Sequence, residues 1–265
     1  EKKNSLIKEL QVKVKAIIVE KPKKWFSEAK RIYTKIIKEA ENYDTCFEYA
    51  TFLYEHKQFT EAIELFQKVQ FYVSNNSQNA STLNILGNLQ RDTNQYAQAI
   101  ISYQEALGIQ KMLAKKNPEN YLSGVAIICN NLGNLQSDVD QYEEALVSYQ
   151  EALGIFKKLE KENPENYLTE IAMTLSNLGL LQSITSNDYQ ALNSFKEALK
   201  ILRKLARGHQ EFYLSDLSMT LNNLGLLLSE VNQYTQALDS YQEALEIQRK
   251  LVKDNPERYL TELAT

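Results

Sequence analysis

The chain is poor in the residues that build turn-rich, cross-linked or membrane-spanning proteins. Its 265 residues include only two cysteines, four prolines and eight glycines. So few prolines and glycines favour helices over a turn-rich all-β fold. Two cysteines cannot make a disulfide framework, which favours a reducing, cytoplasmic location. No apolar run approaches the roughly 18 residues needed to cross a membrane, so we expect no membrane contact.

The net charge of −4 at pH 7 does not suit a dedicated nucleic-acid binder. The charge is nonetheless uneven, because residues 1–40 hold 12 Lys/Arg against 5 Asp/Glu. This basic segment is either a surface that docks on something acidic, such as another domain of the same parent protein, or simply a solvated helix face.

A period of 46 residues organises most of the chain. Four glycines keep this spacing, at Gly87, Gly133, Gly179 and Gly225. Alanines and aromatic residues repeat with them, at Ala99, Ala145, Ala191 and Ala237, and at Tyr103, Tyr149, Phe195 and Tyr241. Self-similarity at a fixed period is typical of a solenoid, in which each repeat buries its apolar face only against its neighbours.

Each repeat is predicted to form a pair of helices. In residues 121–166, apolar and small residues recur at spacings of three and four over 122–136 and again over 142–159. A polar break separates the two stretches at 138–141. The dipeptide Asn163-Pro164 ends the second helix, because neither residue suits a helix interior.

Small residues at fixed places predict close packing within each pair. Gly133 on the first helix, with Ala145 and Ala152 on the second, would let the two backbones approach, while Tyr149 fills the gap between them. Glycine inside a helix costs about 1 kcal/mol relative to alanine. Four such glycines therefore indicate that the close contact more than offsets this cost.

Catalytic and metal-binding patterns are lacking. Cys46 and Cys129 each stand four residues before the small residue of a repeat, which predicts buried, inert thiols. The only histidines, His56 and His209, lie in different repeats, and no His/Cys/Asp/Glu cluster has the spacing of metal ligands. No glycine-rich phosphate loop occurs either. We expect no enzyme activity, no metal and no cofactor.

The pattern resembles the tetratricopeptide repeat over nearly the whole chain. The family signature is matched by Leu132-Gly133, Tyr142, Ala145, Tyr149 and Ala152. Segments 220–225 and 244–247 look more specifically like the long repeats of kinesin light chains. The resemblance implies an all-α fold, a right-handed superhelical α-solenoid of stacked antiparallel helix pairs.

Two features depart from the family pattern. The period is 46 residues instead of the usual 34 or so. In the repeat at 167–212 the tyrosine stands one place late, at Tyr189, with Asp188 at the position that Tyr142 holds.

The period predicts where the repeats begin and end. We expect a divergent helical pair or cap at 1–44, a divergent repeat at 45–74, repeats at 75–120, 121–166, 167–212 and 213–258, and the start of a truncated further repeat at 259–265. Residues 4–19 would form the first helix of the cap, although Val12, Val14 and Ala16 also alternate as in a strand. The incomplete last repeat leads us to expect a larger parent protein.

The first helices of such an array line a groove, and their non-core residues are candidates for binding a peptide. The candidate residues are Asn84, Asn88, Arg91, Asn130, Asn131, Asn134, Asn177, Leu180, Asn222, Asn223 and Leu226. Carboxamides both donate and accept hydrogen bonds, which suits the backbone of a bound peptide. Alternatively, the asparagines only bridge adjacent helices.

The composition of this groove indicates the ligand. Related repeats that hold C-terminal carboxylates use Lys and Arg, and here only Arg91 is available, so a carboxylate clamp is not expected. Polar residues between Asn84 and Asn134 give way to Leu180 and Leu226 further along. This change favours a ligand with one polar and one apolar end.

The sequence therefore predicts a protein–protein interaction scaffold that binds a protein or peptide along its concave groove. One alternative is a regulatory or sensor arm of a larger signalling protein, because by resemblance such repeats often follow nucleotide-binding switch or caspase-like protease domains. A second alternative is a structural array that assembles with copies of itself.

Overall fold

The computed structural model describes residues 2–208 and 213–254, and every regular element within these ranges is helical. The prediction of an all-α fold built from consecutive helix pairs is confirmed. The expected start of a further repeat at 259–265 and the position of His209 lie outside the described residues.

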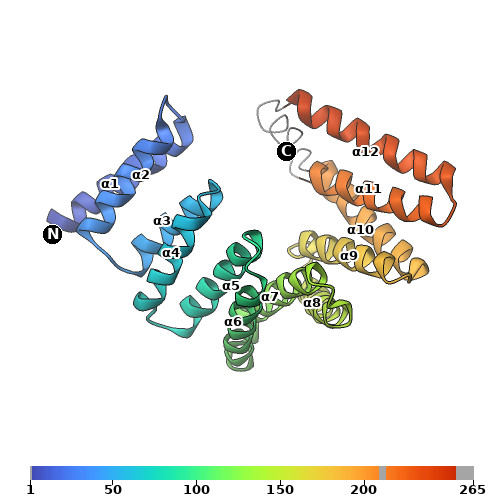
Figure 1. Cartoon of the computed structure of the whole chain (residues 1–265), viewed down its shortest axis with the longest axis horizontal. Coiled ribbons are helices and arrows are strands. Elements are labelled where there is room, and N and C mark those ends of the chain that lie inside the picture. Colours follow the sequence, from blue (N-terminus) through green and yellow to red (C-terminus); the bar gives the residue numbers. More distant parts are fainter. Residues whose placement is uncertain (1, 209–212, 255–265) are drawn as a thin grey trace. The chain divides into compact units, whose positions relative to one another are not determined.

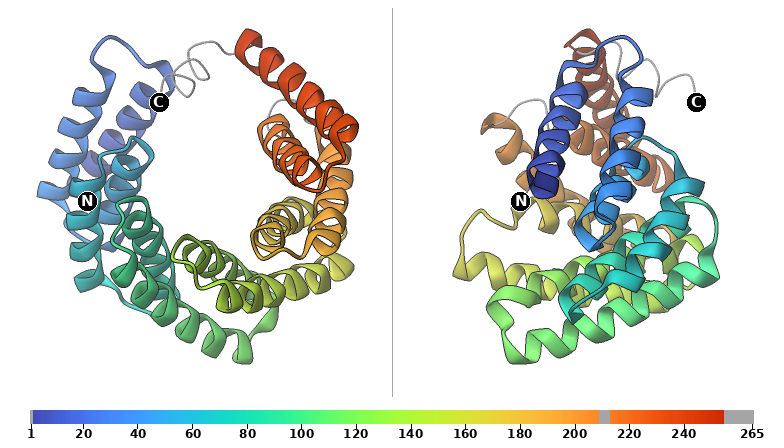
Figure 2. Two further views of the ribbon diagram at one scale, coloured as in Figure 1. Left: turned by 45° about the vertical axis from the view of Figure 1, so that its right-hand side comes forward. Right: turned by 90° about the vertical axis from the view of Figure 1, so that its left-hand side faces the viewer.

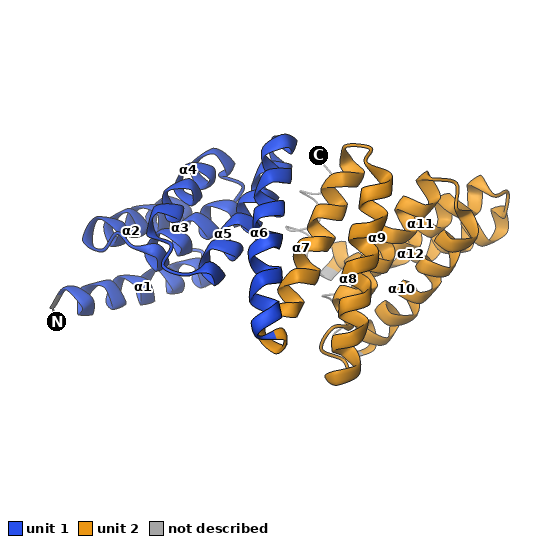
Figure 3. Ribbon diagram, turned by 90° about the horizontal axis from the view of Figure 1, so that it is seen from below, with its two compact units in different colours: residues 1–117 blue, residues 118–265 orange. Residues whose placement is uncertain are grey.

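The chain divides into two compact units between Asn117 and Pro118 (Figure 3). The helices of the first unit are α1 (Lys2–Glu20), α2 (Trp25–Glu39), α3 (Tyr43–Glu55), α4 (Phe59–Val69), the 3₁₀ helix η1 (Gln70–Tyr72), α5 (Asn76–Asp92) and α6 (Tyr96–Lys116). Those of the second unit are α7 (Pro118–Asp138), α8 (Tyr142–Glu162), α9 (Leu168–Ile184), α10 (Asp188–Gly208), α11 (Leu214–Glu230) and α12 (Tyr234–Asp254).

Within each unit an odd-numbered helix packs on the even-numbered helix that follows it (Figures 1 and 2). We call the odd-numbered members the first helices and the even-numbered members the second helices. In the second unit α9 also packs on α8, and α11 on α10, so that successive pairs bury one another's apolar faces.

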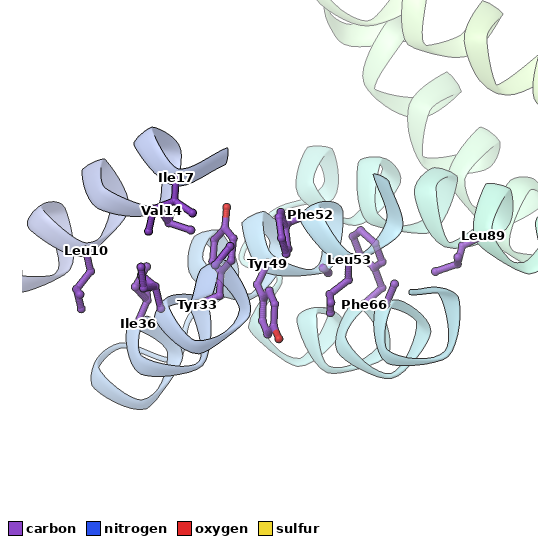
Figure 4. Packing of buried hydrophobic residues seen from close by; sticks show 14 of the residues in the cluster. Leu10, Val14, Ile17, Tyr33, Ile36, Tyr49, Phe52, Leu53, Phe66 and Leu89 are labelled. Atoms are coloured by element: carbon purple, nitrogen blue, oxygen red, sulfur yellow. The ribbon is translucent and has the colours of Figure 1, made fainter. Parts of the chain in front are cut away.

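The first unit is held by one aromatic-rich core (Figure 4). Residues 4–19 are helical rather than extended, because Leu10, Val14 and Ile17 recur at helical spacing and all turn toward α2. Deeper in the core, the rings of Tyr33 and Tyr49 stack with their centroids 5.0 Å apart. The alternation of Val12, Val14 and Ala16 therefore does not mark a strand.

In four pairs an aromatic ring lies directly against a helical glycine. A Cβ atom built on Gly133 would stand 2.8 Å from the ring of Tyr149, and one on Gly179 would stand 2.9 Å from the ring of Phe195. Contacts this short are not tolerated between real Cβ atoms and ring carbons. The glycines are therefore required by close packing, as their period predicts.

The turn inside each of these pairs needs one residue with a positive φ. The four residues are Asn94, Asp140, Ser186 and Asn232, with φ between 58° and 61°. Asn and Asp tolerate this conformation better than most residues. In three of the turns the Asn or Asp also accepts a hydrogen bond from a tyrosine hydroxyl two residues on, as Asp140 does from Tyr142 at 2.6 Å.

The turn between α9 and α10 lacks both the acceptor and the tyrosine of this hydrogen bond. Ser186 replaces the Asn or Asp, Asp188 replaces the tyrosine, and Tyr189 is 77% exposed. The displaced tyrosine thus belongs to a turn in which its hydrogen-bond acceptor has also been lost.

Three of the pairs contain a buried polar contact between their two helices. Ser102, Ser148 and Ser194 donate to the side-chain oxygens of Gln90, Gln136 and Gln182 at 2.7 Å, 2.7 Å and 2.8 Å. In the last pair Leu228 replaces the glutamine, and Ser240 instead donates to the carbonyl of Gln236 in its own helix at 2.9 Å. The buried hydroxyl is therefore satisfied in both arrangements.

Candidate functional site

Four positions recur on α7, α9 and α11, at the same place in each repeat, and lie along one side of each helix because they are four, three and four residues apart. We call these twelve residues the first-helix face. By position they are Ile127, Met173 and Met219; Asn131, Asn177 and Asn223; Asn134, Leu180 and Leu226; and Asp138, Ile184 and Glu230.

The first-helix face exposes large apolar side chains on two adjacent helices. On α9, Met173 is 44% exposed, Leu180 38% and Ile184 50%. On α11, Met219 is 54% and Leu226 49% exposed. Soluble proteins rarely leave several such side chains together without a use, so this patch is the strongest candidate for a binding surface on these helices.

The same face carries no charge along its middle. On α9 no charged residue lies between Glu170 and the helix end at Ile184, and on α11 none lies between Asp216 and Glu230. The helices α9 and α11 also touch directly, since the hydroxyls of Ser176 and Thr220 are 2.9 Å apart. Two uncharged, partly apolar helix sides are thus held next to each other.

Asn134 is occupied by contacts within the protein. Its side-chain oxygen accepts a hydrogen bond from the Tyr149 hydroxyl at 2.7 Å and another from the Asn177 amide at 2.9 Å. The first contact joins α7 to α8, and the second joins α7 to α9. Asn134 and Asn177 therefore bridge neighbouring helices, which is the second of the two roles that the sequence allows for the asparagines.

Asn88 has the same role in the first unit, where it accepts from the Tyr103 hydroxyl at 2.5 Å. Where Phe195 replaces the tyrosine and removes the hydroxyl, Leu180 replaces the asparagine. In the last pair Leu226 replaces the asparagine although Tyr241 keeps the hydroxyl. The apolar residue on the first-helix face therefore occurs both with and without the tyrosine hydroxyl.

The other predicted site residues are distributed over both units. Asn84, Asn88 and Arg91 lie on α5 in the first unit, and the remaining eight lie in the second unit. The Arg91 guanidinium is 3.7 Å from the Asp92 carboxylate, a contact that reduces its capacity to hold a ligand carboxylate. Asn222 and Asn223 on α11 are partly exposed, and their carboxamides form no hydrogen bond with the described residues.

Asn130 differs from the other asparagines. Its side-chain oxygen is buried and has no hydrogen-bond partner among the described residues. A buried acceptor without a donor cannot reach a ligand that stays in the solvent, so Asn130 is a poor candidate for contact with a peptide.

Sequence reasoning singled out Leu180 and Leu226 but missed the other apolar residues of the first-helix face. Ile127, Met173, Met219 and Ile184 were not singled out, although the first three keep the 46-residue period. The available signal was an apolar residue on the side of the helix opposite the glycine and the buried leucines. Ile127 is itself 42% exposed.

The two cysteines are buried, and His56, the one histidine that the structure describes, is partly buried against aromatic rings of the core. Cys46 is fully buried, and burial raises the pKa of its thiol, which disfavours the reactive thiolate. The His56 ring packs 4.5 Å from the Phe52 ring, centroid to centroid. Within residues 2–208 and 213–254, no three His, Cys, Asp or Glu side chains are grouped as metal ligands would be.

Stacked helix pairs with a glycine–aromatic contact and an alanine-lined second helix define a class of repeat protein. Three profiles described as tetratricopeptide repeat match the chain, at residues 80–111, 125–164 and 170–250. Together they cover more than half of it. The chain belongs to the tetratricopeptide repeat family.

Solved structures support the same fold over almost the full length. The structure of BtubC (BKLC) from P. vanneervenii is 21% identical, with 91% of this chain and 92% of that chain covered and a TM-score of 0.65. The apo form of RapI is 17% identical, with 94% and 77% covered and a TM-score of 0.66. At these identities the likeness concerns the fold alone.

A third similar structure is YrrB, described as a TPR protein with an unusual peptide-binding site. It is 18% identical, covers 88% of this chain and 98% of its own, and has a TM-score of 0.50. No curated protein matches the chain. None of the helices in the described ranges is both long and apolar enough to cross a lipid bilayer.

Proposed function

We propose that the chain is a non-enzymatic scaffold that binds a protein or peptide segment on the first-helix face of its second unit. The observation that supports this most is the group of exposed apolar side chains on α9 and α11, Met173, Leu180, Ile184, Met219 and Leu226. Membership of a repeat family whose relative YrrB is described as peptide-binding agrees with it.

The surface favours a segment that is apolar and uncharged where it lies on α9 and α11. A charged side chain placed there would lose hydration without meeting an opposite charge. The methionines suit a surface that adjusts to several side-chain shapes, because their long, unbranched chains repack easily. Asn222 and Asn223 offer carboxamides that could pair with the backbone of the bound segment.

A peptide display experiment tests the proposal. Random twelve-residue peptides are selected on the intact chain, and their affinities are measured for a variant that combines Met173→Glu with Met219→Glu. Both side chains are exposed, so the fold should tolerate the change. We expect the selected peptides to be rich in apolar residues and to lose at least about tenfold in affinity, roughly 1.4 kcal/mol.

The matched control places the same change on second helices. Ile101 on α6 and Val147 on α8 are 56% and 64% exposed, so Ile101→Glu with Val147→Glu introduces the same charge elsewhere. Affinities should stay within about twofold of the unchanged chain. Equal losses in both double variants, or no loss in the methionine variant, would place the binding surface elsewhere.

Self-association is a second candidate, favoured by the outer side of α12. Leu238 and Leu245 are 56% and 45% exposed, whereas their counterparts one repeat earlier, Leu192 and Leu199, pack in the core beside α11. Light scattering across a concentration series distinguishes the two functions. A dimer that Leu238→Glu converts to a monomer would favour self-association, and a monomer throughout would exclude it.

A further inference from the structure

All three methionines of the chain lie at the surface. Met112, Met173 and Met219 are between 41% and 54% exposed, and none of them belongs to the hydrophobic core. Methionine is more often buried in folded proteins, where the core shields its thioether from solvent. In this chain every methionine side chain is therefore accessible to small solutes.

Two of these methionines share one position of the repeat. Met173 on α9 and Met219 on α11 are 46 residues apart, and the two helices are in direct contact. An exposed leucine follows each of them seven residues later, at Leu180 and Leu226. Met112 instead lies on α6, a second helix of the first unit. The chain thus carries two methionines on the first-helix face and one on a different kind of helix.

The two thiols of the chain are shielded from oxidants. Cys46 and Cys129 are both buried. Burial also raises the pKa of the Cys46 thiol, so little of it is present as the thiolate that peroxides attack. A mild peroxide should therefore oxidise the methionines before it reaches the cysteines.

We propose that Met173 and Met219 are a reversible oxidation site that switches off peptide binding on the first-helix face. This inference rests on the proposed function of that face. The step is an oxygen transfer from a hydroperoxide, in which the thioether sulfur attacks one peroxide oxygen and the O–O bond breaks. With hydrogen peroxide the second oxygen leaves as water, so sulfur is oxidised to the sulfoxide and the peroxide is reduced.

A sulfoxide changes the surface without changing the core. Its oxygen is a polar acceptor, and it would stand in the uncharged, partly apolar middle of α9 and α11. Under an apolar segment this oxygen loses its hydration and meets no donor, which costs binding free energy. Because Met173 and Met219 are exposed in the free chain, the fold itself should be unaffected.

On α11 the sulfoxide also competes for the asparagines. Asn222 and Asn223 lie three and four residues after Met219, a spacing that brings side chains together on one side of a helix. Either carboxamide can donate to the sulfoxide oxygen, and it is then not available to the backbone of a bound segment. Oxidation of Met219 therefore removes an apolar contact and occupies a donor.

The test compares the peptide affinity of the reduced and the oxidised chain. The probe is a peptide that has been selected on the intact chain and contains no Met, Cys or Trp. The chain is treated with hydrogen peroxide, which is removed before the peptide is added, and mass spectrometry of proteolytic fragments confirms sulfoxides at the methionines and unmodified cysteines. We expect the affinity to fall at least about tenfold. The helical content, measured by circular dichroism, should not change.

Two variants show which methionines cause the loss. Met173→Leu with Met219→Leu keeps the face apolar and conserves side-chain volume, so that only Met112 can be oxidised. Peroxide should change the affinity of this variant by less than about twofold. Met112→Leu, the matched control, should lose as much affinity as the unchanged chain. Methionine sulfoxide reductases A and B, with dithiothreitol as the reductant, should restore binding, because each enzyme reduces one sulfoxide epimer.

The outcomes separate this inference from the function on which it rests. If the proposed function is wrong, Met173→Glu with Met219→Glu leaves the affinity of the reduced chain unchanged, and the oxidation site is then excluded as well. If only the inference is wrong, that variant loses affinity but the oxidised chain does not. Equal losses on oxidation in the unchanged chain and in the double leucine variant would also overturn it.

Discussion

Helical glycines in the second unit serve different purposes at different places. Gly133 lies against the Tyr149 ring, which is 3% exposed and is fixed by the hydrogen bond from its hydroxyl to Asn134. Gly154 lies inside α8, and a Cβ built on it would have no neighbour within 4 Å. The same residue type is therefore needed at one position and only tolerated at the other.

Replacing each of these glycines with alanine should have opposite effects. Gly133→Ala should lower the free energy of unfolding by about 1–3 kcal/mol, because the ring of Tyr149 cannot move aside. Gly154→Ala should raise it by about 0.5–1 kcal/mol, since alanine restricts the unfolded chain and meets no obstacle. Urea denaturation followed by circular dichroism measures both, and a stabilised Gly133→Ala variant would contradict the packing described for this pair.

Asp216, in the first turn of α11, is a residue whose charge weakens the fold. Burial raises the pKa of its carboxyl above the ordinary value. The folded chain therefore holds this proton more tightly than the unfolded chain does. Its stability falls as the pH rises from the ordinary aspartate range through the raised pKa.

Asp216→Asn should consequently stabilise the protein at pH 7. The gain should shrink as the pH falls through the raised pKa and vanish below about 3.9, the ordinary value for aspartate. Melting temperatures of the two proteins between pH 3 and pH 7 measure it. The matched control is Glu143→Gln, an exposed acid in the first turn of α8. A gain that persists at low pH would show that burial of the charge is not its cause.

The two helices of a pair are also joined by a buried hydrogen bond that cannot be recognised from a single repeat of the sequence. Gln136 and Ser148 are both buried and 12 residues apart, and neither residue type is usual in a core. Their partnership becomes visible only when the repeats are compared, because Leu228 and Ser240 show the pair with its glutamine removed. The side chains satisfy each other where both are present.

A double-mutant cycle measures how much the hydrogen bond between Gln136 and Ser148 contributes to the free energy of unfolding. Ser148→Ala should cost about 1–3 kcal/mol, because it leaves the Gln136 side chain buried without its donor. Gln136→Leu should cost much less, because the Ser148 hydroxyl can turn to a carbonyl of its own helix as Ser240 does. The two changes together should cost less than their sum. As the matched control, Ser240→Ala should have little effect. Additive costs in chemical denaturation would rule the coupling out.

The helices themselves could be predicted from the sequence, whereas the partners of their polar side chains could not. The spacing of Gly133, Ala145 and Tyr149 is enough to predict a close-packed helix pair, because each residue type has one packing role. Asn134 has several possible roles on the same helix side. Its bonds to Tyr149 and Asn177 come from two different neighbouring helices, and their distances depend on how those helices pack.

One local signal ends helices in two different ways. The motif Asn-Pro-Glu occurs at 117–119, 163–165 and 255–257, and at the first two copies the second helix ends just before it, at Lys116 and at Glu162. Pro118 itself begins α7, a position where its missing N–H costs nothing. After Pro164 the chain makes a turn in which Glu165 has a φ of 76°, and α9 begins at Leu168.

At the scale of the molecule, the first helices of the two units present different surfaces. Among the described residues of the first unit, α3 and α5 expose no large apolar side chain, and α1 exposes Val12 and Val19. In the second unit α7 exposes Ile127, and the adjacent helices α9 and α11 expose five. Helices α5 and α9 share the same repeat pattern of buried residues but differ in their exposed side chains. The exposed positions can therefore vary without loss of the fold. Binding is expected where the apolar side chains are.

The three methionines of the chain allow this expectation to be measured directly. Met173 and Met219 lie on the first-helix face of the second unit, while Met112 lies on α6 of the first unit with a similar exposure of 41%. Protein labelled with ¹³C at the methionine methyl groups should give three signals from these residues. When a peptide selected on the intact chain is added, the signals of Met173 and Met219 should shift and that of Met112 should not. Saturable binding that shifts Met112 alone, or none of the three, would contradict the account.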